Sequence, residues 1–282
     1  MTRASHEVVR VVEHHADTSA LADPPAELIV AAGGDGTVAD AMRSVAGRGV
    51  PLTILPIGTA NNIAFTLGIE GEIDDLAAGW HHATAQPFDV GVLDGAGVER
   101  KQFVEGAGGG LVEALMSSIR QRPLPPGDPP EQQLARALRR YRQTLTLLRP
   151  RPWSLRLDGT AHDGDFLLVE VMNTRTVGPN LEFAPVSSPF DGAFTVVTAR
   201  DADRAALAAY LEDRLAGREA RLPLTTQTAR CVEIVDPPTL HVDDELVDFP
   251  ADTQLSLRVQ AGAVPVLVPV AARAASARAS TS

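Results

Sequence analysis

Apolar positions follow two different patterns along the 282-residue chain. In the first part, the short apolar runs 28–32 and 52–55 are each followed by a glycine-rich turn and then by apolar residues at helical spacing. Uniformly apolar runs are typical of buried parallel strands with helices between them. The Val-rich run 7–13 predicts one more strand. Residues 1–86 are therefore predicted to form a doubly wound α/β domain.

From residue 87 the pattern changes to short strand-like runs separated by Gly, Pro, Asn and Asp, which predicts an antiparallel β-sandwich domain over 87–270. Helical periodicity interrupts it at 131–149 and 203–216. The segment 271–282 contains only Ala, Arg, Ser and Thr, which predicts a disordered tail. The predicted strands of the sandwich are 88–93, 103–105, 154–157, 166–172, 194–199, 231–235, 239–242, 255–259 and 264–268.

Composition narrows the range of functions. The chain carries 25 basic and 36 acidic residues, and its net charge of −11 makes nucleic acid an unfavourable partner. A single cysteine excludes an internal disulfide and a zinc site built from several thiolates, as expected in the cytoplasm. Because no apolar stretch approaches the roughly 20 residues of a membrane span, we expect a cytoplasmic protein without a signal peptide. Chemistry that needs a lysine rests on Lys101 alone.

Two glycine-rich turns follow two consecutive predicted strands. GGDGT (33–37) ends the strand 28–32, and PIGTANN (56–62) ends the strand 52–55. Glycine lets the backbone approach a phosphate, and the N-terminus of the next helix offers unpaired N–H groups. Because the carboxyl ends of parallel strands meet at one sheet edge, both turns are expected to line one ligand site. Asp35 would repel phosphate, so we expect it to order the turn or to act on a metal or a hydroxyl.

The pair GGDGT and PIGTANN resembles the catalytic domain of diacylglycerol kinases, a family that includes sphingosine kinases and bacterial lipid kinases. NTRTVG (173–178), AP (184–185), DGAF (191–194) and HVDDE (241–245) look like the later motifs of that family, in the same order. The resemblance implies an α/β nucleotide domain followed by a β-sandwich lipid-binding domain, with the active site in the cleft between them. It implies a kinase that uses ATP and Mg²⁺ to phosphorylate a hydroxyl of a diacylglycerol-like or related lipid.

The resemblance also implies roles for individual side chains. Asp243 matches the general base, Asp35 is the second catalytic carboxylate, and Asp191 and Glu245 match acidic positions around the magnesium ion. On a strand, Asp243 and Glu245 would point to the same face. With Asp244 between them, the crowded charge would raise a carboxyl pKa or recruit a cation. The implied nucleotide-binding residues are Gly34, Asp35, Gly36, Thr37, Gly58, Thr59, Asn61 and Glu245.

The chain departs from the family pattern in three places. Asn62 stands where the PxGTxND motif has an aspartate, and Asp244 replaces the glycine of the Asp-Gly-Glu motif. Only 32 residues precede GGDGT, without the Asn-Pro pair that marks the family's first strand. A parallel crossover needs about a dozen residues or more, and the 12 residues 16–27, with Pro24-Pro25 at their end, leave room for barely a turn or two of helix. That strand is therefore predicted to be absent, which weakens ATP binding unless a homodimer or an upstream extension closes the site.

Two other functions stay open. A catalytically impaired member of the same fold would bind lipid or nucleotide without turnover. NAD kinases also carry GGDGT, although the PIGTANN turn differs from the Asn-Gly pattern of their next loop. The impaired protein would bind its ligand without forming a phosphorylated product, and an NAD kinase would phosphorylate NAD instead of a lipid.

The helix 131–149 and the GAGGG run at 106–110 each allow two interpretations. The helix has an apolar stripe that could pack on the sandwich, with its arginines solvated. Alternatively, it could dock on anionic lipid, which would place the protein peripherally at the inner face of the membrane. GAGGG could form part of the cleft wall or serve close packing. The arginines opposite the stripe are Arg136, Arg139, Arg140 and Arg142.

Overall fold

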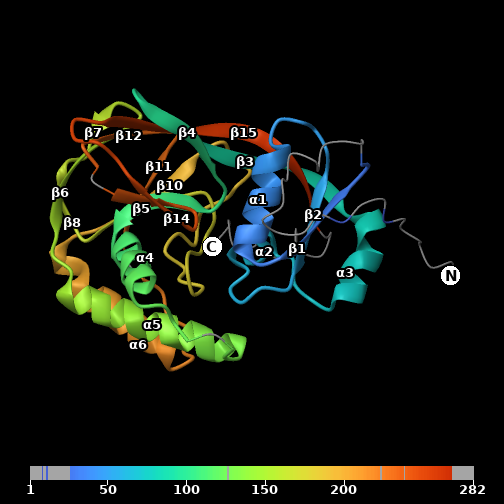
Figure 1. The fold of residues 1–282 in the computed structure, drawn as a ribbon, viewed down its shortest axis with the longest axis horizontal. Coiled ribbons are helices and arrows are strands. Elements are labelled where there is room, and N and C mark those ends of the chain that lie inside the picture. Colours follow the sequence, from blue (N-terminus) through green and yellow to red (C-terminus); the bar gives the residue numbers. More distant parts are fainter. Residues whose placement is uncertain are drawn as a thin grey trace.

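The computed structural model describes residues 8, 11, 26–125, 127–222, 224–237 and 239–268. Within them the chain forms an α/β lobe and a β-sandwich lobe covered on one side by helices (Figure 1). The predicted fold class, an α/β domain followed by an antiparallel sandwich, is confirmed. The predicted strand 7–13, apart from Val8 and Val11, and the tail 271–282 lie outside the described residues.

The α/β lobe is built on two parallel strands whose register places Ile29 beside Leu52. Its helices bury Met42 and Ile63 against these strands in one core. The first strand was expected to be buried on both faces, and this is wrong, because Val30 is 40% exposed while Ile29 is buried. The elements of this lobe are β1 (Ile29–Gly33), α1 (Asp35–Val45), β2 (Leu52–Pro56), α2 (Asn62–Leu67), α3 (Ile73–Gly79) and the 3₁₀ turn η2 (Trp80–His82).

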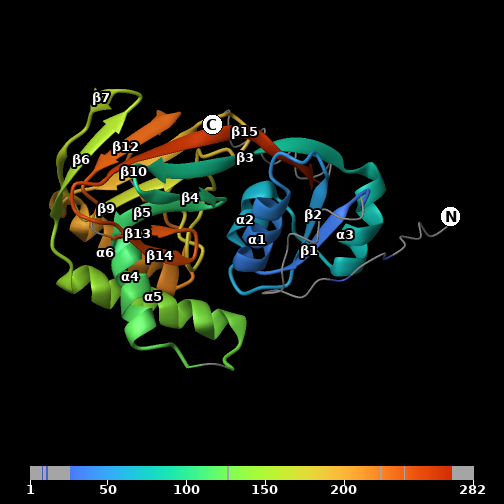
Figure 2. The same ribbon diagram turned by 45° about the horizontal axis from the view of Figure 1, so that its top comes forward.

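Two long antiparallel strands, β3 (Thr84–Gly95) and β15 (Gln254–Val268), connect the lobes (Figure 2). Val266 of β15 lies beside Leu52 of β2, so one sheet continues from the α/β lobe into the sandwich. A register shift between residues 260 and 264 joins the two strands predicted at 255–259 and 264–268 into one. The predicted domain boundary at residue 87 falls within β3, and Phe88 packs in the α/β core.

The sandwich has two sheets whose inner faces meet in a core that includes Phe103, Leu155 and Val171. The shared sheet runs β1-β2-β15-β12-β6-β7, with β3, β4 and β8 attached, and the second sheet runs β11-β10-β9-β5-β13-β14. Their remaining strands are β4 (Val98–Phe103), β5 (Gly106–Gly110), β6 (Arg151–Leu157), β7 (Thr160–Ala161), β8 (Gly164–Phe166), β9 (Leu168–Met172), β10 (Phe194–Ala199), β11 (Thr225–Ala229), β12 (Cys231–Val235), β13 (Thr239–Val242) and β14 (Glu245–Asp248).

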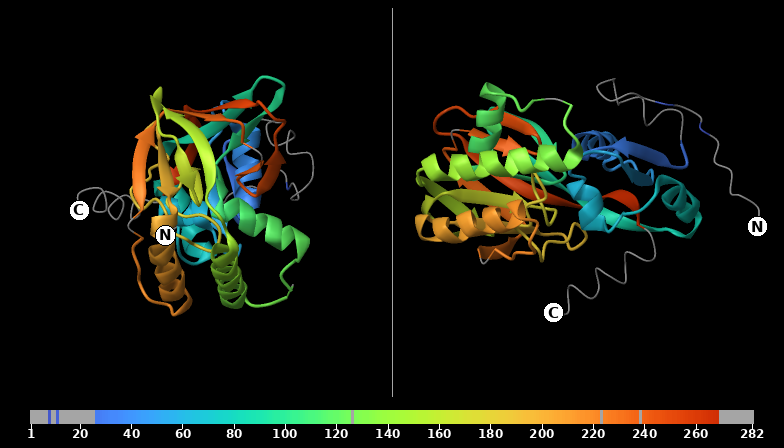
Figure 3. Two further views of the ribbon diagram at one scale, coloured as in Figure 1. Left: turned by 90° about the vertical axis from the view of Figure 1, so that its left-hand side faces the viewer. Right: turned by 90° about the horizontal axis from the view of Figure 1, so that it is seen from below.

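Three helices cover the outer face of the second sheet, with α5 and α6 side by side in Figure 3. Tyr141 and Leu145 of α5 are buried in the same core as Leu168 of β9, so the apolar stripe of α5 packs on the sandwich. Among the described helices, none combines the length and apolar character needed to cross a bilayer. They are α4 (Leu111–Gln121), α5 (Pro130–Leu147) and α6 (Arg204–Leu215), the last preceded by η3 (Asp201–Asp203).

The GAGGG run forms β5, the strand between β9 and β13. Gly108 lies in register with Glu170 on one side and His241 on the other. A Cβ at Gly108 would lie 2.7 Å from Glu170 Oε2. Glycine therefore leaves room for the two flanking side chains to meet over β5, where His241 Nε2 lies 2.6 Å from Glu170 Oε2. Of the two interpretations of this run, close packing accounts for Gly108.

Candidate active site

The two glycine-rich turns lie at the carboxyl ends of β1 and β2 and touch each other. A Cβ on Gly58 would overlap the Cα of Gly34, so the backbones of the two loops meet where only glycine fits. Ile57 N also donates to Gly33 O at 3.2 Å. Gly34 is the N-cap of α1 and gives it no side-chain cap, which leaves N–H groups at the helix N-terminus for an anion. The structure therefore brings the two predicted turns into one place.

Asp35 and Asn61 hold these loops in shape. Asp35 Oδ1 accepts a hydrogen bond from Ile63 N at 3.0 Å, so the first residue of α1 binds the start of α2. Burial raises the pKa of Asp35, and the backbone N–H groups of the second loop oppose that shift. Asn61 has the left-handed φ of 55°, and its amide pairs with both Gly58 N and Gly58 O at 3.0 Å. Both side chains therefore hydrogen-bond to the backbone of the second loop or of the start of α2.

The sandwich lobe approaches the loops at two points. Thr59 Oγ1 donates to Gln133 Oε1 at 3.2 Å, which connects the second loop to the first turn of α5. Gly36 faces the β13–β14 hairpin, since a Cβ there would lie 3.2 Å from Asp244 Oδ2. Thr37 folds back over Gly33 within the first loop. The two loops thus lie against the sandwich lobe at α5 and at the β13–β14 hairpin.

Asp243 lies in the two-residue turn between β13 and β14, with a φ of 51°. Its Oδ2 accepts a hydrogen bond from the guanidinium of Arg43 on α1. Burial raises the pKa of Asp243, whereas Arg43 and the backbone donors lower it. The carboxylate is held from several directions at once. Its Oδ1 accepts from the backbone N–H groups of Val104, Glu105 and Gly106 at 3.0, 2.8 and 3.3 Å.

Glu245 lies on the other arm of the hairpin, so the expectation that it shares a strand face with Asp243 is wrong. Residues 243 and 244 reverse the chain, and β14 begins at Glu245. Its exposed carboxylate pairs with Lys101 Nζ on β4 at 2.9 Å. Lys101, Arg43 and Asp244 also line a cavity of about 230 Å³ beside this turn. The single lysine of the chain therefore lines the cavity beside the β13–β14 turn.

The two predicted magnesium ligands have different neighbours. Asp191 Oδ1 accepts a hydrogen bond from Ala193 N at 3.0 Å. Burial raises the pKa of the neighbouring Asp89, and the charge of Asp191 raises it further. Glu245 is paired with Lys101. Within the described residues, no group of three or more His, Cys, Asp or Glu side chains is arranged to hold a metal ion. Protein-bound Mg²⁺ commonly uses one or two carboxylates together with substrate phosphates, so these ligands stay a prediction.

Glu105 is a residue of the cleft that sequence reasoning missed. It connects β4 and β5 and is half-buried, but its Oε1 is inaccessible to solvent and has no hydrogen-bond partner among the described residues. Burial raises the pKa of Glu105 well above its ordinary value, the charges of Asp35 and Asp243 raise it further, and the Asn62 amide lowers it. The amide at position 62, where the motif has an acid, was the signal that could have prompted a search for a carboxylate elsewhere.

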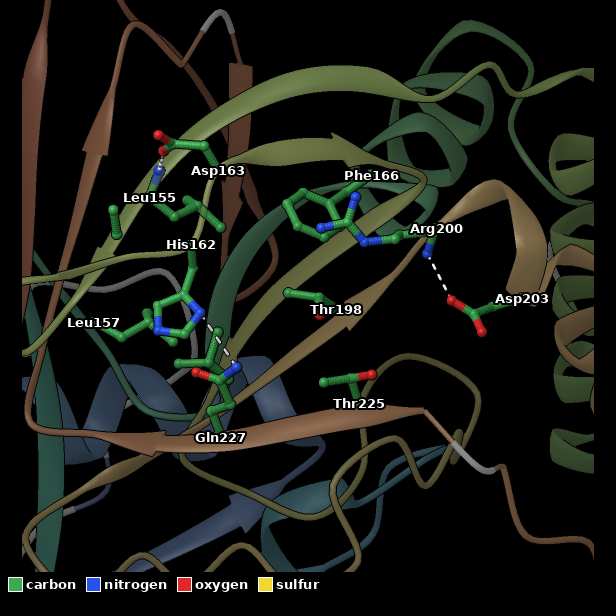
Figure 4. A pocket seen from close by; sticks show the side chains of 12 residues that line it. Leu155, Leu157, His162, Asp163, Phe166, Thr198, Arg200, Asp203, Thr225 and Gln227 are labelled. Carbon is green, nitrogen blue, oxygen red and sulfur yellow. Dashed lines mark hydrogen bonds between the residues drawn. The ribbon is translucent and has the colours of Figure 1, made fainter.

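A larger cavity, of about 310 Å³, opens at the other edge of the sandwich. It is lined by β10 and β11, whereas Asp243 follows β13 near the opposite end of the same sheet. The guanidinium of Arg200 lies 4.5 Å from the ring centre of Phe166, and His162 Nδ1 lies 3.2 Å from Gln227 Nε2. These four side chains are labelled in Figure 4. This cavity is lined by none of the predicted site residues, so the cleft between the lobes is the candidate active site.

Comparisons with known proteins match both lobes. The profile of the diacylglycerol kinase catalytic domain matches residues 3–93, and that of the YegS C-terminal NAD kinase beta sandwich-like domain matches 132–268. The chain is 32% identical over 182 residues to a diacylglycerol kinase of Bacillus subtilis (strain 168), which covers 64% of this chain and 57% of that one. The match therefore spans just over half of that relative's length.

Two further relatives cover more of the chain. A diacylglycerol kinase of Mycobacterium tuberculosis (strain ATCC 25618 / H37Rv) is 27% identical over 257 residues, covering 86% of this chain and 76% of its own length. The crystal structure of a diacylglycerol kinase from Bacillus anthracis str. Sterne has a TM-score of 0.68 at 20% identity, covering 92% of this chain and 85% of that one. The structural likeness supports the two-lobed fold described above.

Proposed function

The chain belongs to the diacylglycerol kinase catalytic-domain family, and from this premise we propose that it is an ATP-dependent lipid kinase. It would transfer the γ-phosphoryl group of ATP to a hydroxyl of a diacylglycerol-like or related lipid. The observation that carries the proposal is the contact between the two glycine-rich loops, opposite buried carboxylates of the other lobe. Phosphoryl transfer depends on positioning and charge stabilisation more than on covalent help, and such a cleft can supply both.

The ATP phosphates are proposed to bind at the loop contact. Gly34, Gly36 and Gly58 bring backbone close to that point, and the N-terminus of α1 adds its N–H groups. Arg43 and Lys101 are cations that line the cavity beside the β13–β14 turn. Mg²⁺ bound with the nucleotide would neutralise phosphate charge, with Asp191 and Glu245 as its predicted protein ligands.

The lipid is proposed to present its headgroup to the cleft while its acyl chains stay in the membrane. Apart from Val242, the residues that line the cavity beside Asp243 are polar or charged, including Lys101 and Glu245, which suits a headgroup and disfavours acyl chains. Contact with the membrane would then be peripheral and reversible. The contacts of three α5 arginines within the protein make that helix a weaker candidate for the contact. Arg136 and Arg142 form ion pairs with Asp128 and Glu212, and Arg140 donates to the Ser118 hydroxyl.

Product identification tests the proposal. The purified chain is incubated with ATP and lipids extracted from bacterial membranes, and the products are identified by mass spectrometry. A phosphorylated lipid that requires both the chain and ATP supports a lipid kinase. ATP binding without any product would favour a catalytically impaired binding protein, and phosphorylation of added NAD would favour an NAD kinase.

A further inference from the structure

We propose that Glu170 and His241 form a buried pair of positioning residues that fixes the turn carrying Asp243. The inference rests on the proposed phosphoryl transfer, with Asp243 as its general base, and adds two residues that act through this base. Glu170 of β9 is 0% exposed and His241 of β13 is 1% exposed. Glutamate is almost never fully buried unless it is paired, so its burial beside His241 calls for an explanation.

The backbone of Asp243 needs to be held. Its φ of 51° lies in the left-handed region that favours glycine, and another residue keeps such a conformation only where its neighbours impose it. Asp243 N donates to Gly106 O at 2.9 Å, and Asp243 O lies 3.1 Å from His241 Nδ1. The peptide groups on both sides of Asp243 are therefore bonded, and His241 holds the one that leads into Asp244.

The partners of His241 determine which of its ring nitrogens carry protons. A backbone carbonyl oxygen only accepts hydrogen bonds, so Nδ1 must be protonated and donate to Asp243 O. Nε2 lies 2.6 Å from Glu170 Oε2, and one proton lies between these two atoms whichever of them carries it. Burial lowers the pKa of His241, but the Glu170 charge and the two hydrogen bonds raise it above its ordinary value. The ring is therefore held with a proton on Nδ1.

Glu170 sets the orientation of the imidazole ring. The two side chains meet over Gly108 of β5, which lies in register with both residues. Because Nε2 is bonded to Glu170, the ring cannot turn away from Asp243 O without breaking that bond. Carboxylates fix the tautomer and the orientation of catalytic and metal-binding histidines in the same way. Glu170 thus holds His241, and His241 holds the backbone of Asp243.

The turn held by this pair lies beside the proposed nucleotide site. Asp244, the other residue of the turn, faces the first glycine-rich loop, since its Oδ2 would lie 3.2 Å from a Cβ at Gly36. A shift of the turn would displace Asp243 from the position in which it serves the reaction, and a misplacement of about 1 Å can cost about 100-fold in rate. The glycine-rich loops are shaped by Asp35 and Asn61, so ATP binding should not depend on the pair.

A double variant separates positioning from stability. Glu170→Met with His241→Leu replaces both buried polar groups by apolar side chains, an exchange that is often neutral or stabilising for a buried ion pair. The urea midpoint and the Kd for ATP should therefore stay close to those of the wild type, whereas kcat for lipid phosphorylation should fall about 100-fold, because Asp243 O loses its donor. Glu70→Met with His82→Leu makes the same exchanges at exposed positions and should keep wild-type kcat. Wild-type kcat in the variant of the buried pair would overturn the inference.

The conservative variant Glu170→Gln should keep the turn in place. Its amide has the size of the carboxyl group and can donate to His241 Nε2, which leaves the ring proton on Nδ1. We expect its kcat to stay close to that of the wild type, whereas Glu170→Met alone leaves Nε2 unpaired and should lower kcat. An equally low kcat in both variants would show that Glu170 acts through its charge and would overturn the inference.

The Asp243→Asn background shows whether the pair acts through Asp243. Once the base is removed, the position of its turn should no longer matter, so adding Glu170→Met and His241→Leu should lower kcat no further. A second loss of about 100-fold in that background would show that the pair acts elsewhere and would overturn the inference.

NMR of the protein labelled with ¹⁵N-histidine gives a readout that does not depend on activity. The His241 signal is the one that shifts most in Glu170→Gln, and in the wild type its Nδ1 should be protonated at neutral pH. An unprotonated Nδ1 would overturn the inference even in an active kinase. Absence of any phosphoryl transfer by the folded wild type would refute the proposed function and, with it, this role of the pair.

Discussion

Arg43 on α1 and Asp243 in the β13–β14 turn form an ion pair that joins the two lobes across 200 positions of sequence. The Asp243 side chain is 1% exposed and that of Arg43 is 24% exposed, so the pair is largely shielded from solvent. Arg43 also pairs with Asp40 on its own helix. Because α1 begins in the GGDGT turn, this pair fixes the hairpin relative to the proposed nucleotide site.

Removal of the Arg43 side chain should destabilise the protein. In Arg43→Ala the buried Asp243 carboxylate loses its charged donor but keeps its backbone donors, and hydrogen bonds to charged groups contribute about 1.5–3 kcal/mol. We expect the free energy of unfolding in urea to fall by about that amount. Arg48→Ala, at an exposed position beyond α1, is the control and should change stability by less than about 0.5 kcal/mol. Equal losses in both variants would show that the pair contributes nothing specific.

A methyl group on Gly58 should abolish ATP binding. Its Cβ would overlap Gly34, so the two loops would have to separate. Isothermal titration of ATP into Gly58→Ala should show no binding, while its far-UV circular dichroism stays that of the wild type. Gly79→Ala is the matched control, because Gly79 lies at the end of α3 with nothing within 4 Å of an added Cβ. Wild-type affinity in Gly58→Ala would place the nucleotide elsewhere.

Gly108→Ala should destabilise the sandwich. The added carbon would press on Glu170 and on the backbone of β9, and overpacking of this kind costs typically about 1–3 kcal/mol. Thermal unfolding should show a lower Tm than that of the wild type. The prediction fails if Gly108→Ala melts together with Gly79→Ala, whose added methyl group has no such neighbours.

The stability of the wild type should depend on the protonation of Glu105. Its pKa is raised in the folded protein, so its contribution to stability is fully present below about pH 4.5 and is lost as the pH rises through the folded-state pKa. Glu105→Gln lacks this loss. Its free energy of unfolding should therefore gain on that of the wild type by up to about 1.4 kcal/mol per pH unit in that window. Urea unfolding of both proteins at a series of pH values measures this difference in the free energy of unfolding. Parallel profiles of the two proteins would contradict the raised pKa of Glu105.

Much of the fold follows from short-range patterns. The strands 194–199, 231–235 and 239–242 have the bounds that the sequence predicts, because β-branched residues lie between clear turn signals. β5 was not predicted as a strand because GAGGG has no apolar alternation, and its role comes from the side chains of β9 and β13. The continuity of β15 also depends on a partner, since β3 lies along it across the irregular residues 260–264.

The site was predictable only in part. The two glycine-rich turns follow from local sequence and from the rule that parallel strands end at one sheet edge. The environment of Glu105 could not be predicted, because its neighbours Asp35, Asn62 and Asp243 come from distant segments. The separation of Asp243 from Glu245 was missed because a turn of two acidic residues interrupts what looked like one strand.

Transfer of radiolabel from γ-labelled ATP to diacylglycerol in mixed micelles tests the central claim most directly. The wild type and Gly79→Ala are predicted to label the lipid, and Gly58→Ala to leave it unlabelled at equal protein concentration. Parallel reactions without protein correct for background. A wild-type protein that binds ATP but leaves every hydroxyl-bearing lipid unlabelled would contradict the account, as would Gly58→Ala that transfers label at the wild-type rate.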